Sequence, residues 1–230
     1  MTPIGVIRRA EPAEVAAALS KVVISPYWAV DWGGAGGSLH LDSGAMAEAV
    51  RRVGAKFEAA EARVAASTSQ FLVALGLWSV SLGSLAVGGV VPDLDGLRYR
   101  VDEDARVRLS LPEPGGWVVT GDPVPLLLRM VVEEQLVPFH TGLRAVVKVA
   151  DGLLWGNVAA ALRSALKPLP GLGDLGDRLS AVPPLRGTLS PDGIRRSCCL
   201  FYRTRGGHTC RACPLAGAVV TRREGQAVTR

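Results

Sequence analysis

Residues 71–91 read FLVALGLWSVSLGSLAVGGVV, and no charged residue occurs between Val64 and Val91. This stretch is long enough to cross a bilayer as a helix. It is the single such stretch in the sequence, however, and the helices expected around it are amphipathic. A helix that is apolar on all sides is also typical of the centre of a soluble core. We therefore predict that residues 71–91 form a buried central helix, and we expect no stable membrane insertion.

The segment before this stretch carries the clearest helical pattern. Apolar residues recur at three- and four-residue steps from Ser43 to Ala66, which predicts an amphipathic helix that packs on residues 71–91. These residues are Met46, Ala49, Val50, Val53, Phe57, Ala60 and Val64. Residues 67–69, Ser-Thr-Ser, are suited to cap the start of the apolar helix. A shorter helix is expected at 11–21, where Pro12 occupies a tolerated first-turn position.

Downstream of residue 91 the pattern changes to strands and then back to helices. Residues 97–101 and 105–111 flank Asp102-Glu103-Asp104, which predicts a β-hairpin, and residues 117–120 are a candidate third strand. A helix opened by Asp122 and Pro123 should end or bend before Pro138. Two further helices are expected at 140–150 and 153–167.

A connection rich in proline and glycine divides the chain. Ten of the 26 residues from Pro168 to Gly193 are Pro or Gly, which predicts an irregular connection without a long helix. We place the domain boundary here, with a mainly helical body at 1–187 and a C-terminal module at 188–230. The predicted fold class is α+β and mainly α-helical, with a small antiparallel sheet and a compact C-terminal module.

Composition narrows the class of protein. The 230 residues are 48% hydrophobic and 20% charged, as expected for a globular chain with a core. Four cysteines are too few for a disulfide scaffold, and the N-terminal sequence MTPIGVIRRAEPAEV has no apolar run long enough for a signal peptide. We therefore expect a cytoplasmic protein, in which clustered cysteines more often bind metal than form disulfides.

The positive charge is concentrated at the C-terminal end. The formal net charge is +5, yet residues 195–230 contain eight Arg and one Glu. The excess is thus a local feature, which either serves function or reflects the general preference of this chain for Arg over Lys. The glycine-rich run at 33–37 lacks the strand–turn–helix setting of a dinucleotide fingerprint and is interpreted as a loop.

The cysteines form one pattern, C-C-x10-C-x2-C. Cys198 is adjacent to Cys199, and Cys210 is followed by Cys213 after two intervening residues. The C-x2-C half is typical of metal sites. Adjacent side chains of an extended backbone point to opposite sides, so the C-C half is awkward for a single tetrahedral zinc. A two-iron cluster needs four thiolates spread over more than one metal, which favours [2Fe–2S] but leaves structural zinc and an oxidised disulfide open.

This spacing resembles the C-terminal signature of the ferric siderophore reductase (FhuF-like) family. Flanking residues strengthen the resemblance, namely Arg195-Arg196-Ser197, Leu200-Phe201-Tyr202-Arg203 and Cys213-Pro214-Leu215. Residues 154–159, LWGNVA, are similar to a second and looser feature of the family. The resemblance implies a [2Fe–2S] cluster held by four ligands, Cys198, Cys199, Cys210 and Cys213.

The function implied by the resemblance is one-electron reduction of Fe(III) in a siderophore, most often of hydroxamate type, with release of Fe(II). Because hydroxamate oxygens hold Fe(III) far more strongly than Fe(II), one electron frees the metal. An external donor, a ferredoxin or a flavin reductase, is then required. Candidate substrate-binding residues are Arg195, Arg196, Arg203 and Trp155. Arginines around the ligands would also raise the cluster potential or attract an acidic donor protein.

Two alternatives remain open at this point. One is a zinc-stabilised module that binds nucleic acid, although Phe201 and Tyr202 are the only aromatic residues near the cysteines that offer base stacking. The other is an iron–sulfur sensing module. We favour the reductase and expect no nucleic-acid partner. His140 and His208 have no metal-ligand spacing, so packing or surface roles are expected, with a hydrogen bond from His208 to the cluster conceivable.

Overall fold

The structure is a computed structural model that describes residues 7–22, 28–32, 42–111 and 113–216, with only the backbone described for residues 28–32. The glycine-rich run at 33–37 and the arginine-rich end beyond residue 216 lie outside the described residues. The described part is mainly helical with two small sheets, which confirms the predicted α+β class.

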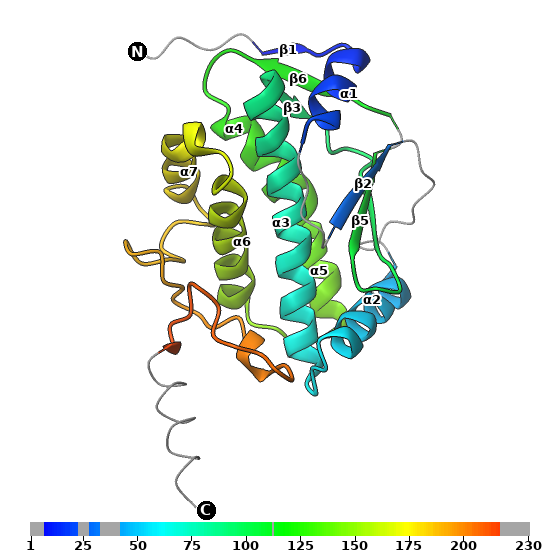
Figure 1. The fold of residues 1–230 in the computed structure, drawn as a ribbon, viewed down its shortest axis with the longest axis vertical. Helices are drawn as coiled ribbons and strands as arrows, with labels where there is room; N and C mark the ends of the chain where they lie inside the picture. Colours follow the sequence, from blue (N-terminus) through cyan, green and yellow to red (C-terminus); the bar gives the residue numbers. More distant parts are fainter. Residues whose placement is uncertain (1–6, 23–27, 33–41, 112, 217–230) are drawn as a thin grey trace, which may run out of the picture.

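Helix α3 (Ala62–Gly88) runs through the middle of the molecule (Figure 1). The helices packed against it are α1 (Pro12–Ser20), α2 (Ser43–Lys56) and α6 (Asp151–Leu166). By length and composition α3 could cross a membrane, but its largest side chain, Trp78, is completely buried within the fold. The predicted buried central helix is thus confirmed, and it begins nine residues earlier than its apolar stretch.

Two glycines of α3 explain how closely α1 approaches it. A Cβ atom on Gly83 would lie 2.8 Å from a Val22 methyl group, and one on Gly88 would lie 2.8 Å from the Ala18 Cβ. Side chains at these positions would push α1 away. Gly83 and Gly88 therefore allow α1 and the residues directly after it to pack closely on α3.

The corner between α2 and α3 corrects two predictions. The helix predicted to extend to Ala66 ends at Lys56, because the chain reverses at Glu58, whose φ is 47°. Residues 67–69 consequently lie inside α3 and do not cap it. Thr68 and Ser69 are tolerated there because their hydroxyls donate to the carbonyls of Val64 and Ala65, both at 2.9 Å.

The strands form two three-stranded sheets. In the first, β6 (Gly116–Val119) lies antiparallel between β1 (Ile7–Arg9) and β3 (Val90–Pro92). In the second, β5 (Val107–Leu111) pairs antiparallel with β4 (Arg98–Val101) and parallel with β2 (Trp28–Trp32). The hairpin is confirmed. The expected third strand, β6, belongs to the other sheet. The sheet that holds the hairpin is mixed, because its edge strand β2 runs parallel to β5.

Pro138 does not end its helix. The chain passes from α4 (Val124–Leu127) through a π-helical segment, η1 (Leu128–Leu136), into α5 (Val137–Val146). The Val137 N–H bonds to the Val132 carbonyl, five residues back. The wider turns let the helix continue through a proline, which donates no backbone hydrogen bond.

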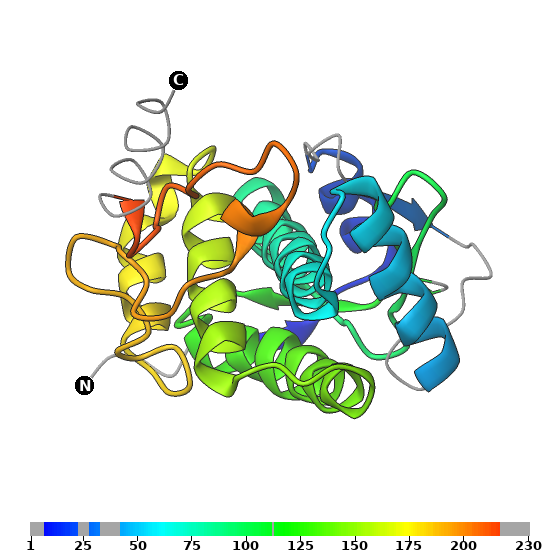
Figure 2. The ribbon, with the colours of Figure 1, turned by 90° about the horizontal axis from the view of Figure 1, so that it is seen from below.

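The connection after α6 is less irregular than predicted. It contains a 3₁₀ turn, η2 (Pro170–Leu172), and a short helix, α7 (Gly173–Ser180), which buries Leu175 and Leu179. The chain then crosses the N-terminal ends of α6 and α3 in a series of turns that includes one 3₁₀ turn, η3 (Phe201–Arg203), drawn in orange in Figure 2. The cysteine-bearing segment thus lies directly on the helical body.

Candidate metal centre

Residues 195–216, here called the cysteine loop, are shaped by tight local turns. Leu200, directly after the adjacent cysteines, has a φ of 66°, a left-handed conformation that is uncommon for leucine. Its N–H points to the Cys198 Sγ at 3.3 Å, and the Leu215 N–H points to the Cys213 Sγ at 3.4 Å. Backbone N–H groups therefore approach a sulfur in each half of the motif, as suits thiolate ligands.

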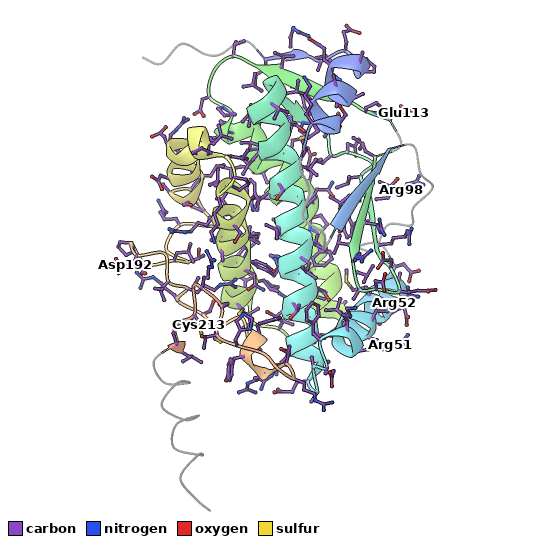
Figure 3. All side chains as sticks on the ribbon, in the orientation of Figure 1. Arg51, Arg52, Arg98, Glu113, Asp192 and Cys213 are labelled. Atoms are coloured by element: carbon purple, nitrogen blue, oxygen red, sulfur yellow. The ribbon has the colours of Figure 1, made fainter. Side chains whose placement is uncertain are left out.

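The cysteine side chains meet in one place. The Sγ atoms of Cys199 and Cys210 are 3.5 Å apart, and the Cys199 thiol also lies within hydrogen-bonding reach of Cys198. Cys213, which is buried, interacts electrostatically with Cys198. In Figure 3 the labelled Cys213 lies at the end of the molecule where α6 begins. The loop thus brings together both halves of the C-C-x10-C-x2-C motif.

The donor set fits a two-iron cluster. Two thiolates on one tetrahedral metal, each about 2.3 Å from it, are separated by about 3.8 Å, close to the 3.5 Å between Cys199 and Cys210. The four cysteines match the four thiolates that [2Fe–2S] requires. Within the described ranges, three or more His, Cys, Asp or Glu side chains do not converge on a single metal-ion position. The match between these residues and a [2Fe–2S] cluster therefore rests on the four thiols and on the contact between the Cys199 and Cys210 sulfur atoms.

The short distances between the thiols shift the pKa values of three of the cysteines. Hydrogen bonds from Cys198 and Cys210 lower the pKa of Cys199 far below its usual range, and the positive charge of Arg195 adds to this effect. The same hydrogen bonds, together with burial, raise the pKa values of Cys198 and Cys210. Cys199 is thus the thiol that ionises first when the loop is without metal.

A buried polar chain links the cysteine loop to two helices. The Arg195 guanidinium donates to the Asn157 side-chain oxygen on α6. Asn157 donates to the Ser67 carbonyl on α3 at 3.0 Å, and the Ser67 hydroxyl donates to the Cys199 carbonyl at 2.7 Å. Arg195, Asn157 and Ser67 are each at most 4% exposed. This chain fixes the backbone of Cys199 relative to α3 and α6.

Arg195 carries a buried positive charge without a carboxylate partner among the described residues. Its guanidinium lies over the Phe71 ring, 5.4 Å from the centroid, and its electrostatic effect is felt at both Cys199 and Cys210. An isolated buried cation is costly unless a negative group compensates it. The cysteine thiolates are that group.

Glycine and serine residues allow the loop to lie close against α6. A Cβ atom on Gly156 would lie 2.8 Å from the Ser197 Oγ, and the Ser197 hydroxyl donates to the Gly152 carbonyl at 2.6 Å. The Trp-Gly-Asn sequence at 155–157 therefore has a clear physical role. Its glycine gives the loop room, and its asparagine holds Arg195.

The other predicted site residues lie around this centre. Trp155 packs edge-on against His140, which is buried and hydrogen-bonded to Gln70 at 3.0 Å. Burial lowers the pKa of His140 to about 3, so the ring is neutral near pH 7. His208 meets the Phe201 ring edge-on. Both histidines thus pack against aromatic rings, as predicted, and the predicted substrate-binding residue Trp155 packs against His140.

Two arginines of the loop secure it to the corner between α2 and α3. Arg203 forms an ion pair with Glu61 at 2.7 Å, and Arg205 pairs with Glu58 at 2.6 Å. Arg196 is exposed, and its backbone N–H bonds to the Thr188 carbonyl. The structure therefore brings Arg195 to the cysteines and gives Arg203 an acidic partner away from them.

A cavity of about 690 Å³ opens beside the cysteines, between α3, α6 and the cysteine loop. Cys199, Cys210 and Arg195 form part of its wall, whereas two other cavities, of about 500 and 700 Å³, have no cysteine in their walls. Sequence reasoning missed Arg163 on α6 and Lys167 at its C-terminal cap, which both line the cavity. Their four-residue spacing on a helix was the available signal, since it places them on one face.

Four thiols gathered beside a buried arginine define a candidate centre for a metal bound by cysteines. Residues 195–215 match the family model described as the FhuF 2Fe-2S C-terminal domain, so the protein carries an FhuF-type domain with a [2Fe–2S] cluster. This confirms the family resemblance inferred from the cysteine motif, and it favours the cluster over structural zinc. No curated protein matches the chain.

Proposed function

We propose that this protein is a cytoplasmic ferric-siderophore reductase, which passes single electrons to chelated Fe(III) and releases Fe(II). The observation that supports this most is the cavity whose wall contains Cys199 and Cys210. Ligand cavities in proteins typically enclose about 300–1,000 Å³, so a volume of about 690 Å³ suits a chelate. A substrate in this cavity would lie against two of the proposed cluster ligands.

We assign the four cysteines as the residues that hold the cluster. When bound, a [2Fe–2S] cluster supplies one electron at a time, which matches the step from Fe(III) to Fe(II). Arg195 stabilises negative charge at Cys199 and Cys210, and the polar chain through Asn157 and Ser67 keeps that charge in place. The electron comes from an external ferredoxin or flavin reductase.

A positive charge beside the cysteines has a cost for this reaction. It stabilises the reduced state and so makes the protein a weaker reductant. Tight Fe(III) chelation makes the substrate hard to reduce as well. Release of iron should therefore depend on removal of Fe(II) by an acceptor.

The test is a single-turnover experiment. The protein is reduced chemically, freed of excess reductant and mixed with ferric hydroxamate, catecholate or citrate complexes in the presence of a ferrous chelator. One Fe(II) should form for each cluster reoxidised, and the yield should fall without the ferrous chelator. A protein that stays reduced with every complex would exclude the reductase function. It would favour an iron–sulfur sensor instead.

The cellular location is tested separately. Fractionation of expressing cells should place the protein in the soluble fraction, because α3 is largely buried by the other helices. Retention in membranes after a carbonate wash would contradict the cytoplasmic proposal.

A further inference from the structure

The wall of the cavity beside the cysteines is rich in positive charge. Arg163, Lys167 and Arg211 line it and are exposed, and among the described residues none of the three forms an ion pair. Arg195 is a fourth, buried cation of the wall, but the cysteine thiolates compensate its charge, and Asp192 is the acidic residue of the wall. A concave surface on which exposed charges of one sign predominate attracts ligands of the opposite sign.

The buried arginine also has unused hydrogen-bonding capacity at this wall. Arg195 is 4% exposed, and its Nε atom has no hydrogen-bond partner among the described residues. Leaving a buried N–H group of a cation unpaired is costly. The thiolates compensate its charge, whereas this N–H group is left without an acceptor among the described residues, directly behind the cavity wall.

The floor of the cavity is apolar and extends well beyond the cysteines. Phe71 and Leu75 lie one turn apart on α3, and Phe201 closes the end formed by the cysteine loop. Lys167, at the far end of α6, belongs to the same wall. The space is thus larger than a cluster needs and combines apolar surface with a cationic rim.

We propose that this cavity binds ferric chelates of net negative charge in preference to neutral or cationic ones. The inference rests on the proposed function and narrows its substrate class. Anionic chelates include catecholates, citrate-type carboxylates and hydroxamates that carry free carboxylates. In the reaction, one electron from the reduced protein converts bound Fe(III) to Fe(II), and a ferredoxin or flavin reductase replaces that electron.

Charge can be varied while the chelating groups stay constant. Desferrioxamine B has a terminal amine that lies outside its three hydroxamates, so its ferric complex carries one positive charge. Acetylation of the amine gives a neutral complex, and succinylation gives a complex with one negative charge. Gallium(III) has the charge of Fe(III) but is not reduced to a divalent ion under these conditions, so gallium complexes report binding alone.

The experiment measures the affinity of the cluster-loaded protein for the three gallium complexes by calorimetry at low salt. We expect the succinyl complex to bind about tenfold more tightly than the amine complex, with the acetyl complex between them. The double variant Arg163→Gln/Lys167→Gln should remove most of this difference. The matched control is Arg100→Gln/Lys148→Gln, which replaces an exposed Arg and Lys outside the cavity wall and should preserve the difference.

The outcomes separate the inference from the function on which it rests. Equal affinities, tighter binding of the cation or no binding of any gallium complex would overturn the cavity proposal. Fe(II) release from the matching ferric complexes would then still support a reductase. If the charge order appears with gallium and depends on Arg163 and Lys167, the anion cavity stands even where no Fe(II) forms. Visible absorption of the cluster confirms that each variant is loaded and folded around it.

Discussion

The helical body and the cysteine loop are held together by different forces. The body buries large apolar side chains such as Trp78, Phe139 and Met46, all less than 2% exposed. The loop buries polar groups instead, and its fixed position depends on Arg195 and the bonds that join it to α6 and α3. Apolar burial tolerates small shifts, whereas a buried charge does not. The body should therefore fold without metal, while the loop depends on it.

Removal of one cysteine is the most severe way to test this contrast. Cys199→Ser should abolish the cluster, reducing about two iron atoms and two acid-labile sulfides per chain to near zero. Metal and sulfide analysis measures this, and far-UV circular dichroism should keep its helical signal. Thr209→Ala, in the same loop, is the matched control and should retain the cluster. Full iron content in Cys199→Ser, or stoichiometric zinc without sulfide in the parent, would contradict the assignment.

Replacement of the buried arginine changes the charge within the loop and leaves the body intact. Arg195→Gln removes a positive charge beside Cys199, which destabilises the more negative reduced state and should lower the midpoint potential by on the order of 50 mV. Arg195→Lys keeps the charge and should recover most of the potential. The measurement is a redox titration followed by visible absorption. An unchanged potential in Arg195→Gln would show that Arg195 has only a structural role.

Acid should weaken the body through His140. Its pKa is lowered to about 3 by burial, and Arg144 adds a smaller effect, whereas the unfolded chain binds this proton near its usual value of about 6.5. The unfolded state therefore gains a proton first, and stability is lost as pH falls from about 6.5 towards 3. At pH 5 the loss is about 2 kcal/mol. Urea unfolding of parent and His140→Gln should show a shallower pH dependence in the variant. Equal slopes would refute the assignment.

A single methyl group tests how closely the loop approaches α6. Gly156→Ala places a Cβ atom 2.8 Å from the Ser197 Oγ and should destabilise the protein by about 1 kcal/mol. Gly156→Ala/Ser197→Gly should relieve the clash. Gly152→Ala is the matched control, because a Cβ atom there meets nothing within 4 Å. Its stability should stay level or rise slightly through helix propensity. Thermal unfolding is the measurement, and equal losses for both alanine variants would rule out the close contact.

Periodicity predicted the elements whose own side chains bury a face. Met46 and Val53 follow a helical repeat, and they are buried where that repeat places them. The end of α2 was predicted ten residues too late, because the apolar repeat continues through Phe57 and Ala60 across the corner. The π-helical passage before Pro138 carries no local signal. Its wider turns let the packed helix continue into the turn that contains the proline.

The candidate site likewise has a part that the sequence could predict and a part that depends on the tertiary structure. That the cysteine side chains meet could be predicted from their spacing, since the motif is local in the sequence. Arg195 was a candidate because it precedes the cysteines, yet its bond to Asn157 joins residues 38 apart in sequence. The cavity depends on α6 lying beside α3 with the loop across them. The spacing of Arg163 and Lys167 predicts a shared helix face, but that this face lines the cavity follows only from the tertiary structure.

The direction of the two central helices has an electrostatic consequence. Helices α3 and α6 run side by side and both begin at the end of the molecule that the cysteine loop covers (Figures 1 and 2). Their aligned peptide dipoles place about half a positive charge at each N-terminus, where an iron–sulfur group with four thiolates is strongly negative. Together they rival one arginine, and no side-chain substitution removes them. The backbone alone therefore provides a lasting positive field, and cluster binding should survive in Arg195→Gln even as its potential falls.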